Sequence, residues 1–80
     1  MQLDRIFDAL ASGPRRQILA YLSAADLTTT ELAERFAMSS PTISRHLSVL
    51  ETAGLVTSER KGQRVLYRLN RDSLVNSLTG

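Results

Sequence analysis

The residues with the clearest chemical character lie between positions 39 and 50, in the segment SSPTISRHLSVL. On a helix, which turns about 100° per residue, Ile43, Leu47 and Leu50 share one side of this segment. The opposite side carries small and hydroxylic side chains with one long cation: Pro41, Ser44, Arg45 and Ser48. Such a face can approach base edges closely and still offer hydrogen-bond donors and acceptors. No acidic residue, which phosphate would repel, occurs from 39 to 50.

Charge is distributed unevenly along the 80 residues. Residues 1–59 carry five arginines and seven acidic residues, a net charge of −2, whereas residues 60–80 carry five cations and one acid, a net charge of +4. Those five cations are Arg60, Lys61, Arg64, Arg68 and Arg71. One-sided charge attracts polyanions, although a solvated basic hairpin without any partner has the same composition.

The sequence offers no constellation for catalysis or for a selective metal site. His46 is the single histidine and there is no cysteine, so thiolate ligands for zinc and thiols for redox sensing are both missing. Ser44 and His46 lie two positions apart on one helix and point in different directions, unlike the members of a Ser–His–Asp triad. We therefore expect a protein that is not an enzyme and that uses no cofactor and no metal.

Hydrophobic periodicity predicts two helices in the first quarter of the chain. The i, i+3, i+4, i+7 spacing of one apolar stripe is followed by Leu3, Ile6, Phe7 and Leu10. Ser12, Gly13 and Pro14 interrupt this stripe, and proline suits the first turn of the next helix. We expect that second helix over about 14–23.

Capping signals locate the next two helices. Leu27 and Thr28 are expected to form a very short strand, and Thr28 with Glu31 fits a capping box that opens a third helix over roughly 30–37. A turn at Met38 separates it from a fourth helix over about 40–53. That helix is expected to start at a Ser39 or Ser40 cap, to hold Pro41 in its first turn and to stop at Gly54.

Beyond Gly54 the hydrophobic period changes from about 3.6 to 2. Two strands, Leu55–Arg60 and Arg64–Leu69, are predicted around the turn Lys61-Gly62-Gln63. Val65, Tyr67 and Leu69 should share one face of the second strand. A final helix is expected from about Asp72, with an apolar side formed by Leu74, Val75 and Leu78.

Two helices joined by three or four residues and followed by a basic hairpin form a winged helix-turn-helix. We therefore predict a single domain over residues 1–80, mainly α with a small β-hairpin wing, in the order α-α-α-α-β-β-α with an extra strand near 27–28. The recognition helix would span about 40–53 and the wing about 55–69. A chain this short buries little surface and contains no disulfide, so self-association is the expected source of further stability.

The run PTISRHLSVLETAGLVTSERKGQRVLYRLN resembles the recognition helix and wing of the ArsR/SmtB family of bacterial repressors. The run ALASGPRRQILAYL resembles the second-helix signature of that family. The resemblance implies DNA contacts at Ser39, Ser40, Thr42, Ser44, Arg45, His46, Lys61, Gln63 and Arg64. It also implies that the first and last helices form a dimer interface through Leu3, Ile6, Phe7, Leu10, Leu74, Val75 and Leu78.

The departures from the family concern metal sensing. Sensing members carry cysteines on the third helix, where this chain has the residues 30–34, or Asp, His and Glu ligands on the last helix, where it has Asp72, Asn76 and Ser77. These groups do not form a selective transition-metal site. The chain therefore resembles a short branch without a sensor, in which repression or autorepression of the repressor's own operon is common.

These observations predict a homodimeric, sequence-specific DNA-binding repressor acting on an inverted-repeat operator. A second hypothesis is a winged helix used for protein–protein contact without nucleic acid, because fold alone does not determine function. That role would favour an apolar or acidic fourth helix. No apolar run approaches the roughly 20 residues that span a bilayer, so we expect a cytoplasmic protein without a membrane partner.

For several side chains the sequence is compatible with two different roles. Arg45 either reads a base or contacts a phosphate, and His46 either contacts DNA or is a half-buried side chain that bridges the helix to neighbouring backbone. Arg15 and Arg16, near a helix start that disfavours cations, either reach phosphate or form salt bridges with Glu31, Glu34 or Asp8. Arg68 and Arg71 are candidates for pairing across the dimer.

Overall fold

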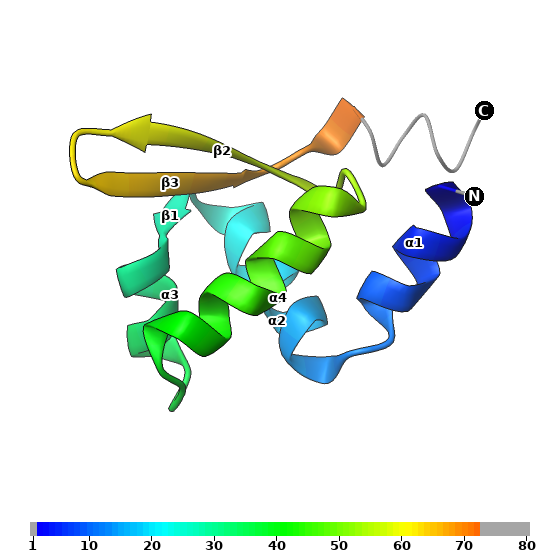
Figure 1. Cartoon of the computed structure of the whole chain (residues 1–80), viewed down its shortest axis with the longest axis horizontal. Helices are drawn as coiled ribbons and strands as arrows, with labels where there is room; N and C mark the ends of the chain where they lie inside the picture. Colours follow the sequence, from blue (N-terminus) through cyan, green and yellow to red (C-terminus); the bar gives the residue numbers. More distant parts are fainter. Residues whose placement is uncertain (1, 73–80) are drawn as a thin grey trace.

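The computed structural model describes residues 2–72. In chain order the elements are α1 (Gln2–Leu10), α2 (Gly13–Ala24), β1 (Leu27–Thr28), α3 (Thr29–Arg35), α4 (Ser40–Thr52), β2 (Val56–Lys61) and β3 (Arg64–Leu69). Figure 1 shows α4 in front of α2, with the β2–β3 hairpin along one edge and α1 at the end farthest from the hairpin tip. This is the arrangement of a winged helix-turn-helix, with α3 and α4 as the helix pair and the hairpin as the wing.

The helices start where short polar side chains replace missing backbone partners. The Ser12 hydroxyl accepts the Arg15 N–H at 3.3 Å and opens α2, and the Ser39 hydroxyl accepts the Thr42 N–H at 3.3 Å and opens α4. At α3 the predicted capping box is complete, because Thr28 Oγ1 accepts the Glu31 N–H at 3.2 Å while the Glu31 carboxylate accepts the Thr28 N–H at 2.9 Å. These caps satisfy N–H groups that have no partner within the helix. All three predicted starts are confirmed within one residue.

The sheet has the strand order β1-β3-β2 and is antiparallel throughout. Leu27 pairs with Tyr67, which confirms the very short strand expected at 27–28. The first hairpin strand begins at Val56 and not at Leu55, because Leu55 still belongs to the turn after α4 and its N–H donates to the Leu50 carbonyl at 2.9 Å. The turn itself relies on Gly54, whose φ of 78° lies in the left-handed region that glycine adopts without strain.

The third helix ends earlier than the expected 30–37. Its last residue is Arg35, and Phe36 is already extended, with φ −110° and ψ 149°. Phe36 turns its ring against Tyr21 of α2, edge to face, with 5.6 Å between the ring centroids. Tertiary packing of this aromatic pair accompanies the early end of α3.

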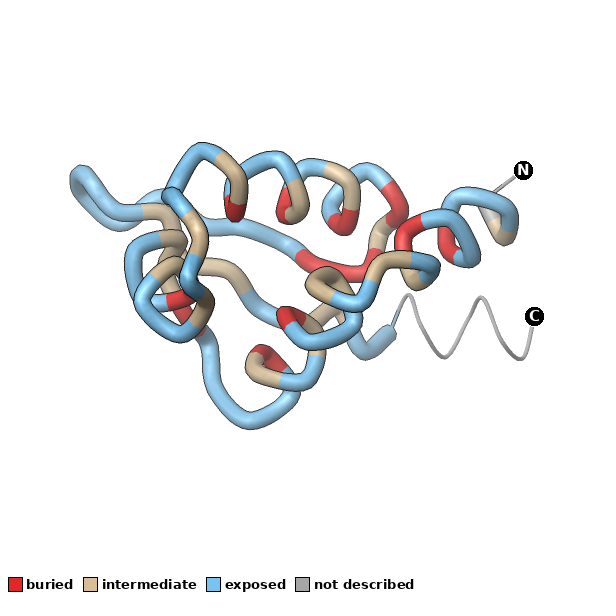
Figure 2. The backbone as a smooth tube through the Cα atoms, turned by 90° about the horizontal axis from the view of Figure 1, so that it is seen from below, coloured by how far each residue is buried: buried red, intermediate tan, exposed pale blue. Residues whose placement is uncertain are grey.

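The core lies between the helices and the base of the hairpin, as the buried segments in Figure 2 show. It is formed by aliphatic side chains from α1, α2, α3, α4, the turn after α4 and the two outer strands, namely Ile6, Ala9, Ile18, Leu22, Leu27, Leu32, Ile43, Leu47, Leu50, Ala53, Leu55 and Val56. Three of these come from α4, so the inner face of this helix is held on the rest of the fold. Because the inner face is fixed in this way, the opposite face of α4 points away from the core.

The predicted final helix lies outside the described residues, apart from its expected start at Asp72. This applies to Leu74, Val75 and Leu78 as dimer residues and to Asn76 and Ser77 as possible ligands. Among residues 2–72, no helix is both long enough and apolar enough to cross a membrane.

Candidate nucleic-acid interface

The outer face of α4 is exposed in the part of the chain that the structure describes. Ile43, Leu47 and Leu50 are fully buried, whereas Ser44 and Arg45 are exposed, together with Pro41 and Ser48. The predicted division of this helix into an apolar inner face and a small polar outer face is therefore confirmed. Arg45 has no hydrogen-bond or ion-pair partner among the described residues, so its guanidinium fork is available to an external acceptor.

The first turn of α4 already uses part of its hydroxyl groups. Ser39 Oγ accepts the Thr42 N–H, and it lies 3.0 Å from Thr42 Oγ1. Ser40 is exposed and has no such partner in the described part of the chain. Ser39 and Thr42 thus combine a structural role at the helix start with their predicted place at the interface.

His46 is half-buried on the flank of α4, and its neighbour is Arg15 from α2. Nη1 of Arg15 lies 3.5 Å from His46 Nδ1, while Nε of Arg15 donates to the Ala9 carbonyl at 2.8 Å and Nη2 to the Asp8 carbonyl at 3.1 Å. Arg16 likewise donates to the Leu10 carbonyl at 2.7 Å. The predicted salt bridges of Arg15 and Arg16 with Glu31, Glu34 or Asp8 do not form among residues 2–72, because both cations donate to backbone carbonyls instead. Their predicted contact with phosphate stays a prediction. Both cations meet the carbonyl end of α1, where the helix dipole favours positive charge.

The wing presents its predicted residues at the hairpin tip. Lys61, Gln63 and Arg64 are exposed, and Gly62 holds the turn with a φ of 63°. Lys61 Nζ lies 3.9 Å from a carboxylate oxygen of Glu59, which partly offsets its charge. Arg64 has no hydrogen-bond or ion-pair partner within the described chain.

Arg68 and Arg71 have partners within their own chain. Arg68 lies 3.3 Å from the Asp26 carboxylate and 3.4 Å from the Glu59 carboxylate, and Arg71 donates to the Ser23 carbonyl at 3.0 Å. Both cations thus have acceptors within residues 2–72, and their pairing across a dimer stays a prediction. The antiparallel register explains the Glu59 contact, because it places Glu59 on the face of the sheet that carries Arg68. Asp26 directly precedes β1, the strand on the other side of β3.

The base of the wing is attached to the last turns of α4. The Ser58 hydroxyl donates to the Glu51 carboxylate at 2.7 Å. Burial raises the pKa of the Tyr67 hydroxyl, and the negative charge of Glu51 raises this pKa further. Tyr67 stands directly opposite Ser58 in the sheet. The Ser58–Glu51 hydrogen bond thus joins β2 of the wing to the recognition helix, which helps both elements to meet one duplex.

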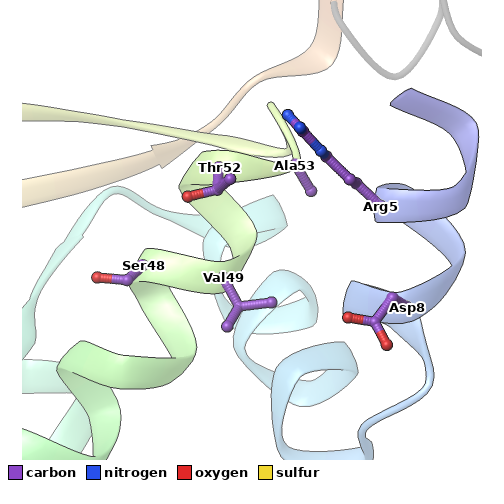
Figure 3. A pocket seen from close by; sticks show the side chains of 6 residues that line it. All are labelled: Arg5, Asp8, Ser48, Val49, Thr52 and Ala53. Atoms are coloured by element: carbon purple, nitrogen blue, oxygen red, sulfur yellow. The ribbon is translucent and has the colours of Figure 1, made fainter. Parts of the chain in front are cut away.

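Two cations without a polar partner among residues 2–72 were not predicted to bind DNA, namely Arg5 and Arg60. Arg60 pairs with Val65 in the register and therefore lies on the same hairpin face as Tyr67. Neighbouring residues of a strand point to opposite faces, so the sequence alone could have placed Arg60 on the face opposite to Lys61. Arg5 lines an open groove between α1 and α4, beside Thr52 and Ala53, with Asp8 at the other end (Figure 3). No local pattern indicates this proximity, which depends on how the two helices pack.

The apolar stripe of α1 is divided between the core and the surface. Ile6 is 2% exposed because it packs into the chain's own core, so it offers a partner almost no area, contrary to the expectation. Phe7 is 60% exposed, and it is the one large apolar side chain that the described residues leave so open. Leu3 and Leu10 are half-buried. Within residues 2–72, no group of three or more His, Asp or Glu side chains is arranged to hold a metal ion.

Comparison with known proteins agrees with this geometry. The sequence model of the family described as "Bacterial regulatory protein, arsR family" matches residues 9–58. The chain is 38% identical over 76 residues to the transcriptional repressor SdpR of Bacillus subtilis (strain 168), covering 95% of this chain and 84% of that protein. It is 36% identical over 73 residues to the arsenical resistance operon repressor of Staphylococcus xylosus, covering 91% and 70%.

Among solved structures, the fold is similar to the homodimeric winged helix-turn-helix DNA-binding domain of a possible ArsR-family transcriptional regulator from Mycobacterium bovis. The TM-score is 0.86 at 33% identity, covering 96% of this chain and 72% of that chain. A crystal structure of another ArsR family transcriptional regulator has a TM-score of 0.86 at 31% identity, with 96% of this chain and 78% of that chain covered.

Proposed function

Because the chain belongs to the arsR family of bacterial regulatory proteins, we propose that it is a sequence-specific DNA-binding repressor that acts as a homodimer. The observation that supports this most strongly is the outer face of α4, which is exposed, carries no acidic residue from 39 to 50, and presents the Arg45 guanidinium without a polar partner among residues 2–72. A helix with this face fits the major groove, where base edges offer acceptors to such donors.

Within this proposal the predicted residues divide into two roles. Arg45 reads a base, because a guanidinium matches the O6 and N7 acceptors of guanine with two hydrogen bonds. The remaining contacts hold the protein on the phosphates and set its register, and they come from Ser39, Ser40, Thr42, Ser44, His46, Lys61, Gln63 and Arg64. Arg60 joins this set, since it is exposed on the hairpin and has no polar partner in the described chain.

Self-association supplies the second half of the operator contact. Two α4 helices related by a two-fold axis enter successive major grooves about 34 Å apart, which requires an inverted repeat. Phe7, with Leu3 and Leu10 beside it, is the apolar surface of α1 available to the second copy. The relative from Mycobacterium bovis is described as homodimeric, which supports this arrangement.

Bound over a promoter in the cytoplasm, the dimer excludes RNA polymerase. We infer that this repression does not respond to a metal or to a thiol oxidant, because the sequence has no cysteine and a single histidine. No cofactor enters the proposal.

A new carboxylate on α4 tests the proposal. Ser44→Glu places a negative charge on the outer face, where it would meet the polyanion, and we expect at least a tenfold loss of affinity for promoter-region duplex in a gel shift. Gln17→Glu is the matched control, since Gln17 is equally exposed but lies on α2, behind α4 (Figure 1). Affinity of the unmodified protein should fall steeply between low and high salt. Absence of any shift at either salt concentration would instead favour a protein–protein module.

A further inference from the structure

Arg15 is the side chain that connects three helices at one point. It belongs to the first turn of α2, and two of its nitrogens donate to carbonyls in the last turn of α1, at Asp8 and Ala9. Its third nitrogen, Nη1, lies 3.5 Å from His46 Nδ1 on α4. Each guanidinium nitrogen thus has an acceptor inside the chain, and Arg15 is only partly exposed.

The chemistry of this contact fixes the proton of the imidazole. A guanidinium is always charged and carries donors without any acceptor. His46 Nδ1 must therefore offer its lone pair to Arg15, and the ring hydrogen of the neutral imidazole then resides on Nε2. No hydrogen bond within residues 2–72 uses Nε2, so this N–H remains available.

We propose that Arg15 is a positioning residue for DNA recognition, which holds His46 in the Nε2–H tautomer and so presents a fixed donor beside Arg45 on α4. This inference rests on the proposed function, because the acceptor for Nε2–H is an oxygen or nitrogen atom of the duplex. Three of the five N–H groups of Arg15 are used by Asp8, Ala9 and His46, and a direct phosphate contact through the other two is the alternative that the salt dependence below tests. In the proposal, Arg15 acts through the histidine.

A neighbouring residue provides a matched control. Arg16 also belongs to the first turn of α2 and also donates to a carbonyl at the end of α1, that of Leu10, at 2.7 Å. It has no contact with His46. Arg15→Lys and Arg16→Lys each keep the charge and remove the planar fork, so both disturb the end of α1 while one alone disturbs the histidine.

The tautomer is measured on the free protein by ¹⁵N–¹H NMR of the imidazole nitrogens. We expect the Nε2–H form in the unmodified protein and in Arg16→Lys, and a mixture of tautomers in Arg15→Lys. A predominant Nδ1–H form in the unmodified protein, or an equal response of the two variants, would overturn the proposal.

The consequence for binding is measured with a duplex selected by this protein from a random pool. Arg15→Lys should weaken binding about three- to tenfold, the effect of one hydrogen bond, and Arg16→Lys should leave it unchanged. Arg15→Gln, which removes the charge, should keep the slope of affinity against salt, whereas loss of a direct phosphate contact lowers that slope by about one. A lowered slope would show that Arg15 touches DNA and would contradict a positioning role.

His46→Gln completes the test, because glutamine keeps a distal N–H donor but has no acceptor in the position of Nδ1. In this background Arg15→Lys should cause no further loss, and a loss as large as in the unmodified protein would contradict action through His46. The two readouts separate the two proposals. If no duplex is selected, the proposed function fails, while the NMR comparison of Arg15→Lys with Arg16→Lys still decides whether Arg15 sets the tautomer.

Discussion

At the scale of single residues, exposure and partner count separate side chains that look alike in the sequence. Arg45, Arg68 and Arg15 are all arginines near the proposed interface, but Arg68 pairs with two carboxylates and Arg15 with two carbonyls and a histidine. Arg45 alone of the three has no such partner within residues 2–72. An arginine whose donors are unused gains most from a bidentate acceptor, which is why base reading is assigned to it.

Arg45→Ala and Lys61→Ala should therefore have different effects on DNA binding. Loss of Arg45 should reduce discrimination at one base pair by about 1–3 kcal/mol, whereas loss of Lys61 should weaken all sequences about equally and reduce the salt slope by about one. Competition between a selected duplex and a random duplex measures both. Equal losses on the two duplexes for both variants would contradict the division into reading and positioning residues.

At the scale of elements, local patterns were sufficient wherever the determining contact is local. The Thr28–Glu31 capping box, the Ser39 cap with Pro41 and the alternation of β3 were all predictable, because each depends on residues two to four positions apart. The inward side of α4 was predictable for the same reason. The elements within residues 2–72 were thus predictable from the sequence to within about two residues.

The contacts that could not be predicted from the sequence depend on how separate helices and strands pack against one another. The Arg15–His46 contact joins residues 31 positions apart, and the partners of Arg68 come from the residue before β1 and from β2. Ile6 and Phe7 are adjacent and equally apolar, yet the packing of α1 against the core buries the first and exposes the second. No periodicity argument distinguishes those two positions without the neighbouring helix.

The start of α3 gives a prediction at this scale. Thr28→Ala removes the hydroxyl that caps the helix and should lower the free energy of unfolding by about 0.5–2 kcal/mol, whereas Thr30→Ala, on an exposed position of the same helix, should cost less. Chemical denaturation measures both. Equal costs for the two variants would mean that the cap does not stabilise the fold.

The same capping box should make stability depend on pH. Hydrogen bonds from the Thr28 backbone and side chain lower the pKa of Glu31 below its ordinary value of 4.5, with Arg35 and Arg64 contributing. A carboxyl with a lower pKa in the folded state stabilises the fold above 4.5, and this contribution is lost as the pH falls through the folded pKa. The free energy of unfolding of Glu31→Gln should therefore be lower than that of the unmodified protein at neutral pH, and the difference should disappear in acid.

At the scale of the whole molecule, the two ends of the fold have different tasks. The hairpin tip and the start of α4 lie at one end and α1 at the other (Figure 1). Cations gather at the first end, and the exposed Phe7 lies at the second. A dimer that joins two α1 helices therefore keeps both wings on the outside, which is the geometry that an inverted repeat requires.

Ile6→Ala and Phe7→Ala distinguish folding from assembly. Ile6→Ala should lower the free energy of unfolding by about 2–5 kcal/mol, because it leaves a cavity in the core. Phe7→Ala should leave the fold intact and shift the protein from dimer to monomer, measured by analytical ultracentrifugation. A stable dimer in Phe7→Ala would contradict the proposed role of α1.

The most direct test of the account is the selection of bound fragments from a random duplex pool, sequenced for the unmodified protein and for Arg45→Ala. We expect the unmodified protein to select an inverted repeat with half-sites about one helical turn apart, and Arg45→Ala to lose its preference at one position of each half-site. A motif without two-fold symmetry, or one that Arg45→Ala leaves unchanged, would contradict the claim that two α4 helices read DNA through this arginine.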